Sequence, residues 1–233
     1  MKYKINLHTH TDEDPQDFVN YSIYECLNTA SSLGFGAIAL TCHNKFINND
    51  EYIKYAESKG ILLISGIEKT IQKRHIVILG CGVNIENIQT FNGLREYKKL
   101  NPNIFIIAAH PCFPGGYSLT EKELISNKGL FDAIEYSWFY TKYINFSKSG
   151  AVLAESLGIP IVATSDTHEL QLLNSGYITI ELGEKTPSAI FESIRRGAFK
   201  NFSEPQTFHR VVVSYTKGKF NTTLKRLGLK SAN

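Results

Sequence analysis

Short apolar runs rich in β-branched residues alternate with segments of helical spacing along most of the chain, and this alternation constrains the fold more than any other feature. It predicts repeated βα units around a parallel sheet. Seven or eight strands favour a closed or nearly closed barrel, although an open doubly wound sheet would give a similar pattern. The predicted strands are Tyr3–His8, Ala37–Thr41, Ile61–Glu68, His75–Gly80, Ile104–His110, Ala133–Trp138, Ile161–Asp166 and Tyr177–Leu182.

Between these strands the apolar spacing predicts helices, several of which end at a glycine such as Gly34 or Gly158. The predicted helices are Asp17–Leu33, Asp50–Lys59, Ile85–Leu100, Thr120–Asn127, Tyr143–Leu157 and Pro187–Arg196. With 233 residues, 42% of them hydrophobic, the chain is long enough for one substantial core. We therefore expect a single barrel domain over residues 1–207, followed by an extension over 208–233.

Composition argues against a membrane protein and against a disulfide framework. No apolar run approaches the roughly 18 residues of a membrane helix, and a polar segment begins at His8, too early for a signal peptide. The four cysteines include no C-x-x-C pair, so we expect reduced thiols and a cytoplasmic protein.

The basic residues are unevenly distributed. Residues 208–233 hold six of the 25 lysines and arginines and no acid, so the body has 19 basic against 22 acidic residues. A solvated basic end is the ordinary interpretation, but the extension also makes nucleic acid a possible partner. Packing is expected for residues 208–215, with Val211–Tyr215 as a candidate strand, and mobility beyond.

The histidines concentrate at one end of the predicted strands. Five of the first six lie at or just beyond a C-terminal strand end, where ligands gather in parallel α/β folds, while His75 opens a strand. Glu68 and Asp166 share that location. The seven histidines are His8, His10, His43, His75, His110, His168 and His209.

Two doublets have the spacing of metal ligands. His8 and His10 stand two residues apart at a strand end, so both imidazoles point to the same side. Asp166 and His168 repeat the spacing with a carboxylate and an imidazole, a mixture suited to zinc, manganese or iron. A lone histidine there is usually structural, but two doublets with further histidines and Glu68 favour a metal site.

In four motifs taken in order, the sequence resembles the PHP (polymerase and histidinol phosphatase) domain family, over residues 5 to 168. The motifs are Leu7-His8-Thr9-His10-Thr11, Thr41-Cys42-His43-Asn44, Gly66-Ile67-Glu68 with His75 and Ala109-His110-Pro111, and Ser165-Asp166-Thr167-His168. The resemblance implies a distorted, TIM-like (βα)7 barrel with a site for three metal ions.

Residue by residue, the resemblance implies three sets of ligands, of which the first two share Glu68 as a bridge. The first set is His8, His10, Glu68 and Asp166, the second is Glu68, His75 and His110, and the third is Asp14, His43 and His168, with Asp12 as the alternative to Asp14. The segment that holds Asp14 is one residue shorter than the usual spacing. Glu68, Asp166 and His168 are the predicted catalytic residues.

Other residues near the motifs have more than one interpretation. Cys42 stands where the family usually has an aspartate, and is expected to be a buried, small apolar residue unless it coordinates a rearranged third site. Lys45, Lys69 and Arg74 flank the ligands, and each is either a substrate-phosphate group or an exposed charge. Glu135 is either an acid that orients His110 or an ordinary buried glutamate.

The predicted function is hydrolysis of a small phosphomonoester, such as a nucleotide, a sugar phosphate or histidinol phosphate, by water activated on two or three divalent ions (zinc, manganese or iron). No G-x-S-x-G elbow or glycine-rich phosphate loop suggests another mechanism. The alternatives are a phosphodiesterase or exonuclease on nucleic acid, metal-dependent amide hydrolysis on a similar barrel, and a non-catalytic metal-binding regulatory module.

Overall fold

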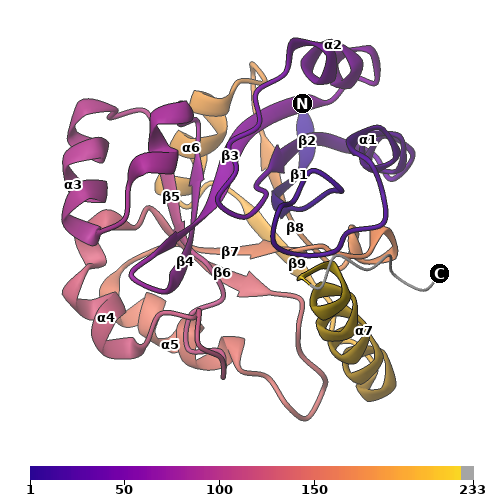
Figure 1. Cartoon of the computed structure of the whole chain (residues 1–233). Helices are drawn as coiled ribbons and strands as arrows, with labels where there is room; N and C mark the ends of the chain where they lie inside the picture. Colours follow the sequence, from indigo (N-terminus) through magenta and orange to yellow (C-terminus); the bar gives the residue numbers. More distant parts are fainter. Residues whose placement is uncertain (227–233) are drawn as a thin grey trace.

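A mixed sheet, in which the first strand of the chain lies between β2 and β8, curls into a nearly closed barrel (Figure 1). The computed structural model describes residues 1–226, without the side chains of residues 215, 217–219, 221 and 224–226. The order across the sheet is β7-β6-β5-β4-β3-β2-β1-β8-β9. The strands are β1 (Lys2–Thr9), β2 (Phe35–Leu40), β3 (Leu62–Ile71), β4 (Arg74–Leu79), β5 (Phe105–Ala108), β6 (Ala133–Ser137), β7 (Ile161–Thr164), β8 (Gly176–Glu181) and β9 (Lys200–Ser203).

Two strands run against the others. The strands β1, β2 and β3 pair in parallel, as do β5, β6 and β7, whereas β4 is antiparallel to both β3 and β5. The strand β8 is likewise antiparallel to β1 and β9. The start of β4 therefore lies at the same edge of the barrel as the carboxyl ends of β3 and β5.

The barrel closes where β7 approaches β1, β8 and β9. Thr9 and Thr167 form a parallel bridge, and the Asn201 side chain hydrogen-bonds the backbone of β7 at 2.7 Å and 2.8 Å. Gly176 permits this closure, because a Cβ there would lie 2.1 Å from the carbonyl oxygen of Thr164. The expected TIM-like barrel is confirmed; the open sheet is not.

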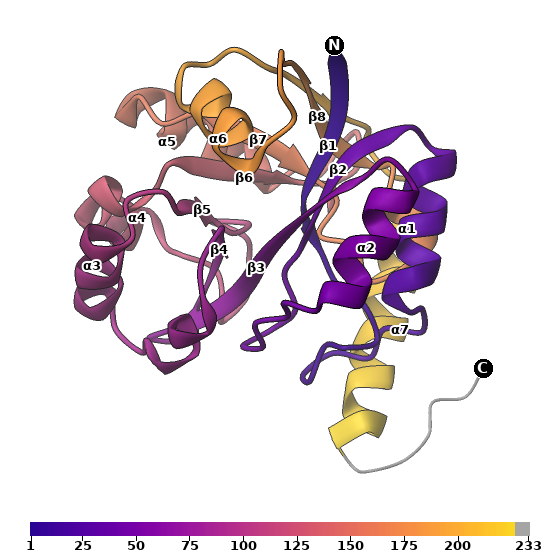
Figure 2. The ribbon, with the colours of Figure 1, turned by 90° about the horizontal axis from the view of Figure 1, so that it is seen from above.

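Helices cover the outside of the barrel in two groups. Figures 1 and 2 show α1 and α2 on one side and α3, α4 and α5 on the other. The helices are α1 (Ile23–Ser32), α2 (Asp50–Ser58), α3 (Phe91–Leu100), α4 (Glu121–Ser126), α5 (Ser147–Leu157), α6 (Pro187–Arg195) and α7 (Phe208–Arg226), with short 3₁₀ helices at Val83–Asn87, Lys128–Leu130 and Leu170–Leu172.

Capping residues explain why two predicted helices begin later than expected or divide. Ser22 caps α1 in a capping box with Glu25, so the helix begins at Ile23 and not at Asp17. Thr90 caps α3, which separates it from the preceding 3₁₀ turn within the predicted helix Ile85–Leu100. The helix α5 begins at Ser147 instead of Tyr143.

The barrel interior is apolar, and α6 contributes to it. Inward-facing residues such as Ile5, Val77 and Ile178 belong to one buried cluster with Phe191 of α6, whose ring stacks on Phe105 at 5.0 Å. Two further apolar clusters lie under the outer helices. Buried polar residues gather instead near the carboxyl ends of the parallel strands.

The C-terminal extension is helical. The candidate strand Val211–Tyr215 was predicted wrongly: these residues lie within α7, which extends from the barrel at the lower right of Figure 1. The expected mobile region begins inside this helix, and residues 227–233 lie outside the described part. No helix among the described residues has both the length and the apolar character required to span a bilayer.

Candidate metal centre

The candidate ligands converge at the barrel edge formed by the carboxyl ends of the parallel strands. His8 lies in β1, Glu68 lies in β3, and His110 and Asp166 follow β5 and β7 by two residues. His75 joins them from the start of β4, because that strand is antiparallel to β3. The reversed strand explains how a histidine that opens a strand reaches the same site.

Glu68 lies at the centre of the cluster and is 1% exposed. Its Oε2 is 2.9 Å from Nε2 of His43 and 3.4 Å from Nε2 of His8 and of His10. Its Oε1 is 2.9 Å from Nδ1 of His75 and 3.2 Å from Nε2 of His110. One carboxylate therefore faces five imidazoles, an arrangement suited to a bridging ligand.

Three groups of ligand atoms are compact enough to hold an ion, because the atoms within each lie within 4.8 Å of one another. The groups are His8, His10, Glu68 and Asp166; His43, Glu68 and His75; and His10, His43 and His168. The first group contains the same four residues as the first predicted set. The second contains His43 where the prediction has His110, and the third contains His10 where the prediction has Asp14.

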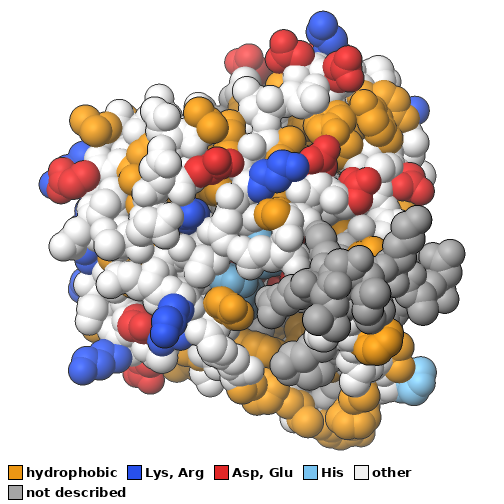
Figure 3. All heavy atoms as spheres, in the orientation of Figure 1, with side chains coloured by type: hydrophobic (Ala, Val, Ile, Leu, Met, Phe, Trp, Pro, Cys, Tyr) orange, Lys and Arg blue, Asp and Glu red, His pale blue; other side chains and the backbone are white. Residues whose placement is uncertain are grey.

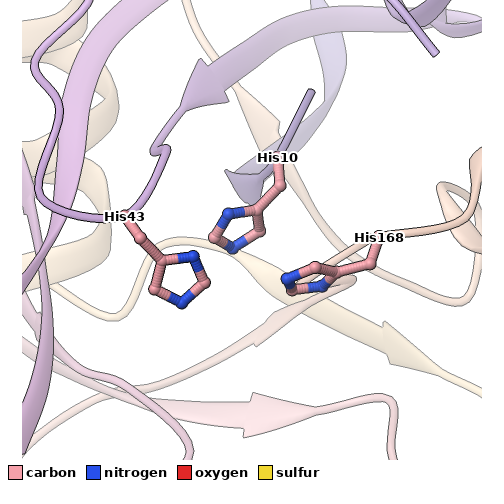
Figure 4. Close-up of side chains that lie close together, drawn as sticks. All are labelled: His10, His43 and His168. Atoms are coloured by element: carbon pink, nitrogen blue, oxygen red, sulfur yellow. The ribbon is translucent and has the colours of Figure 1, made fainter. Parts of the chain in front are cut away.

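The third group is shown in Figure 4, where the rings of His10, His43 and His168 face a common space. The rings of His10 and His168 stack at 4.2 Å. Nε2 of His75 is buried without a hydrogen-bond partner among the described residues. A buried nitrogen without a partner is costly, and a bound cation would satisfy it. The donor set therefore fits divalent metal ions.

Asp14 lies behind two of these histidines. Its Oδ2 is 2.8 Å from Nδ1 of His10 and from Nδ1 of His43, and it accepts a third hydrogen bond from the backbone N–H of His43. Its Oδ1 accepts the backbone N–H groups of Gln16 and Asp17. With Nδ1 protonated and held in this way, each ring presents Nε2 to the cluster. Direct coordination by Asp14 stays a prediction.

Asp17 was missed by the sequence interpretation. Its Oδ2 lies 3.2 Å from Nε2 of His168, and it borders the cavity at the site. Its Oδ1 accepts a hydrogen bond from Thr222 of α7 at 3.1 Å. Its position in the sequence could have indicated a ligand, because Asp17, like Asp14, follows His10 by a few residues. Asp12, which was considered as the alternative ligand, is exposed.

Glu135 of β6 anchors two candidate ligands from behind. Its Oε1 accepts the Nδ1–H of His8 at 2.7 Å, and its Oε2 accepts the backbone N–H of His110 at 2.7 Å. Thr164 also donates its hydroxyl to Oε1. One of the two interpretations of Glu135 was an acid that orients His110. Glu135 does contact His110, but through the backbone, and the imidazole that it orients is that of His8.

The metal-free cluster is strongly polarised. Burial alone would raise the pKa of Glu68, but the imidazoles of His75 and His43 outweigh it and hold that pKa well below its ordinary value. Burial alone would lower the pKa of His8, but the carboxylates of Glu135 and Asp166 raise it well above its ordinary value. Metal ions must therefore displace protons that are held more tightly than usual.

Two candidate ligands have strained backbones. His110 has φ of 30° and Asp166 has φ of 39°, in the left-handed region that such residues rarely adopt. Each lies two residues beyond its strand, so the predicted strands Ile104–His110 and Ile161–Asp166 both ended two residues too late. Strain of this kind is typical of functional sites, where surrounding contacts hold it in place.

Cys42 does not belong to the three compact groups of candidate metal ligands. It is fully buried in the apolar core under α1 and α2, and its Sγ is 3.7 Å from Oγ1 of Thr11. Burial raises the pKa of its thiol to about 12. This placement agrees with the interpretation of Cys42 as a small apolar residue.

A cavity of about 650 Å³ opens over the cluster. Figure 3 shows histidine side chains in pale blue at the floor of this hollow, with hydrophobic side chains along its border. Glu68, His75, His110 and His168 line it, as do residues of α7. The candidate ligands are therefore accessible to a small molecule from one side.

The three predicted phosphate-binding residues do not line the cavity. Lys45 pairs with Glu13 at 2.6 Å, and Arg74 pairs with Glu123 at 2.9 Å. Lys69 is 4% exposed, and burial lowers its pKa. Their role as phosphate ligands stays a prediction.

The fold and this cluster define a metal-binding α/β barrel. The family model of the PHP domain matches residues 6–190. The chain belongs to the PHP domain family, a family of metal-dependent phosphoesterases. No curated protein matches the chain significantly.

Solved structures share the fold. A two-domain protein from Bacteroides vulgatus, which contains a predicted PHP-like metal-dependent phosphoesterase, is 17% identical with a TM-score of 0.67; the match covers 88% of this chain and 65% of that one. PsfC from Pseudomonas syringae is 16% identical with a TM-score of 0.67, over 94% of this chain and 98% of that one. The lesion-specific endonuclease PfuEndoQ from Pyrococcus furiosus is 15% identical with a TM-score of 0.62, over 86% and 58%. The chain thus spans less than two thirds of the first and third of these proteins.

Proposed function

We propose that this protein hydrolyses small phosphomonoesters, such as a nucleotide, a sugar phosphate or histidinol phosphate, with two or three divalent metal ions. The observation that carries the proposal is the position of Glu68, whose two oxygens lie within 3.4 Å of imidazole nitrogens of five histidines. A single carboxylate shared in this way supports a multinuclear site, since one ion uses only about four to six ligands.

The proposed first site consists of His8, His10, Glu68 and Asp166, and the proposed second site of Glu68, His75 and His110. For the third site, His43 and His168 remain, and we propose Asp17 in place of Asp14. Asp17 lies 3.2 Å from His168 and borders the cavity, whereas Oδ2 of Asp14 holds the Nδ1 atoms of His10 and His43. Zinc, manganese and iron all suit these nitrogen and oxygen donors.

Bound divalent ions supply Lewis acidity, a water of lowered pKa and neutralisation of phosphoryl charge. The side chains of the site do the positioning. Glu68 and Asp166 place negative charge at the centre of the cluster, while Glu135 and Asp14 fix the orientation of the imidazoles. His168 borders the cavity, where it is placed to face a substrate. No protein nucleophile is required.

The proposal is tested by metal analysis together with turnover. Gently purified protein should contain at least two ions per chain and hydrolyse p-nitrophenyl phosphate, and a chelator should abolish the activity. His110→Ala should lose metal. His209→Ala is the matched control, because His209 is exposed on α7, and it should retain the metal content of the wild type. A content at or below one ion after reconstitution would contradict the multinuclear site.

A second candidate is phosphodiester cleavage in nucleic acid, which the basic extension and the fold shared with PfuEndoQ favour. If residues 208–233 contact a polyanion, their deletion should weaken oligonucleotide binding and flatten its salt dependence. The same deletion also removes the α7 residues that line the cavity and Thr222, which hydrogen-bonds Asp17, so p-nitrophenyl phosphate hydrolysis should fall as well, and the salt dependence of oligonucleotide binding is the discriminating readout. A fully metallated wild type that is inert on every ester would instead favour a non-catalytic regulatory module.

A further inference from the structure

Aromatic side chains from three separate segments border the cavity over the metal cluster. Two follow β5, two follow β6, and one precedes α1. They are Phe113 and Tyr117, Trp138 and Phe139, and Phe18. Catalysis by the cluster requires none of these rings, so their presence at the cavity calls for a separate explanation.

The rings pack against one another, and one of them also packs against a candidate metal ligand. Phe139 contacts Phe113 edge to face at 5.3 Å and Trp138 at 5.2 Å. Tyr117 stacks on the ring of His75 at 4.6 Å. Rings fixed by such contacts lose little freedom when a ligand binds, so they form a preorganised apolar wall.

The charge of the cavity lining complements this wall. Among the residues that the structure describes, the lining contains no lysine or arginine, and Glu169 and Asp17 add negative charge. With these residues alone, a phosphate is neutralised only at the metal cluster, and a second phosphate farther out meets no cation from the described lining. Hydroxyl groups suited to a sugar come from Ser118, Ser137 and Thr223, among others.

We infer that the substrate is a phosphomonoester whose alcohol carries a planar aromatic ring, of the nucleoside monophosphate class. This inference rests on the proposed function and specifies its substrate. Planar rings stack on aromatic side chains, and a cavity of about 650 Å³ is of the size that holds one small molecule. A nucleic-acid strand requires a cationic track along its backbone, which the described lining lacks.

Trp138 permits a direct test, because it is the only tryptophan of the chain and it borders the cavity. Zinc-loaded protein is mixed in stopped flow with adenosine 5′-monophosphate or with ribose 5-phosphate, and binding is followed by tryptophan fluorescence and calorimetry. The two probes carry the same phosphate and sugar, and differ in the base. We expect the nucleotide to bind about tenfold more tightly or better, with fluorescence quenching. Equal affinities would overturn the inference.

Phe139→Leu keeps the apolar bulk but removes the aromatic face, so it should weaken nucleotide binding about tenfold and leave ribose 5-phosphate binding within about twofold. Phe113→Leu serves the same purpose if the first variant is unstable. Tyr143→Leu is the matched control, since Tyr143 is 95% exposed on the same loop as Phe139 and does not line the cavity. Equal weakening of both probes by Phe139→Leu would also contradict the inference.

Turnover separates this inference from the proposed function. Hydrolysis of both esters with the same kcat/KM would contradict aromatic selection and support the phosphoesterase proposal. Selective binding of the nucleotide without hydrolysis of either ester would contradict the phosphoesterase proposal and support the aromatic site.

Discussion

Oε1 of Glu135 lies 2.7 Å from Nδ1 of His8, and neither side chain is exposed to solvent. The hydrogen bond fixes which nitrogen of His8 carries the proton, so Nε2 faces Glu68 and Asp166. Such partners behind a metal-binding histidine set its orientation and its basicity. The contact joins β6 to β1 across the barrel, which is why it becomes evident only in the folded chain.

Glu135→Gln should lower metal affinity by about ten- to a hundredfold. The carboxylate accepts hydrogen bonds from His8, His110 and Thr164, and an amide has one acceptor oxygen for these three donors. Competition with a chromophoric chelator measures the effect. Glu96→Gln, at an exposed position on α3, is the matched control and should bind metal like the wild type. An unchanged affinity in Glu135→Gln would show that the acid plays no part in the site.

Asp17→Asn and Asp14→Asn should differ in the number of ions lost. If Asp17 completes the third site, its amide variant loses about one ion per chain and retains the others. Asp14 holds both His10 and His43, which belong to more than one compact group of ligand atoms, so Asp14→Asn should weaken binding of all the ions. Mass spectrometry of the native protein counts the ions directly. Loss of a single ion in Asp14→Asn, with none lost in Asp17→Asn, would restore Asp14 as the ligand.

The chelated protein should be most stable at a mildly acidic pH, below the optimum of the metal-loaded form. The raised pKa values of His8 and His43 stabilise the metal-free fold below about pH 6.5, and this stabilisation is lost as the pH rises through the folded-state values. The lowered pKa of Glu68 stabilises the metal-free fold above about pH 4.5, and this contribution is lost as the pH falls further through the folded-state value.

The metal-loaded form needs neutral imidazoles, so its stability should rise toward and beyond neutral pH. Thermal unfolding across pH, with and without chelator, measures both curves. Coincident optima would mean that the imidazoles do not compete between protons and metal.

The alternation of apolar and helical segments predicted βα units around a sheet, because each buried strand and each outer helix carries its own periodicity. It left the closed barrel and the open sheet as alternatives, and the resemblance to the PHP family favoured the barrel. The strand β9 escaped prediction, since Lys200 and Asn201 are exposed and the strand lacks a continuous apolar run. Val211–Tyr215 was a candidate strand because three consecutive valines indicate β-structure locally, although these residues belong to the continuous helix Phe208–Arg226, in which the N–H of Val211 bonds the carbonyl of Thr207.

Strand ends and motifs in the sequence could indicate only the candidate ligands that lie at or near the ends of strands. His8, His10, Glu68 and Asp166 converge as expected, because parallel strands deliver their carboxyl ends to one edge. The roles of Asp14 and Asp17 depend on how the loop between β1 and α1 turns back over the barrel, and no local periodicity describes such a path. The aromatic rings are also contributed by loops, so their assembly at one cavity was not evident from the sequence.

The central claim is metal-dependent phosphoester hydrolysis, and Asp166→Asn tests it most directly, with p-nitrophenyl phosphate and nucleotides as substrates, with and without chelator. The substitution preserves shape while it removes negative charge from the group that Asp166 forms with His8, His10 and Glu68. We predict a fall in turnover of at least about a hundredfold, complete loss of wild-type activity on chelation, and a change within about tenfold for the control Cys42→Ser. Activity that survives chelation, or an Asp166→Asn variant as fast as the wild type, would contradict the account.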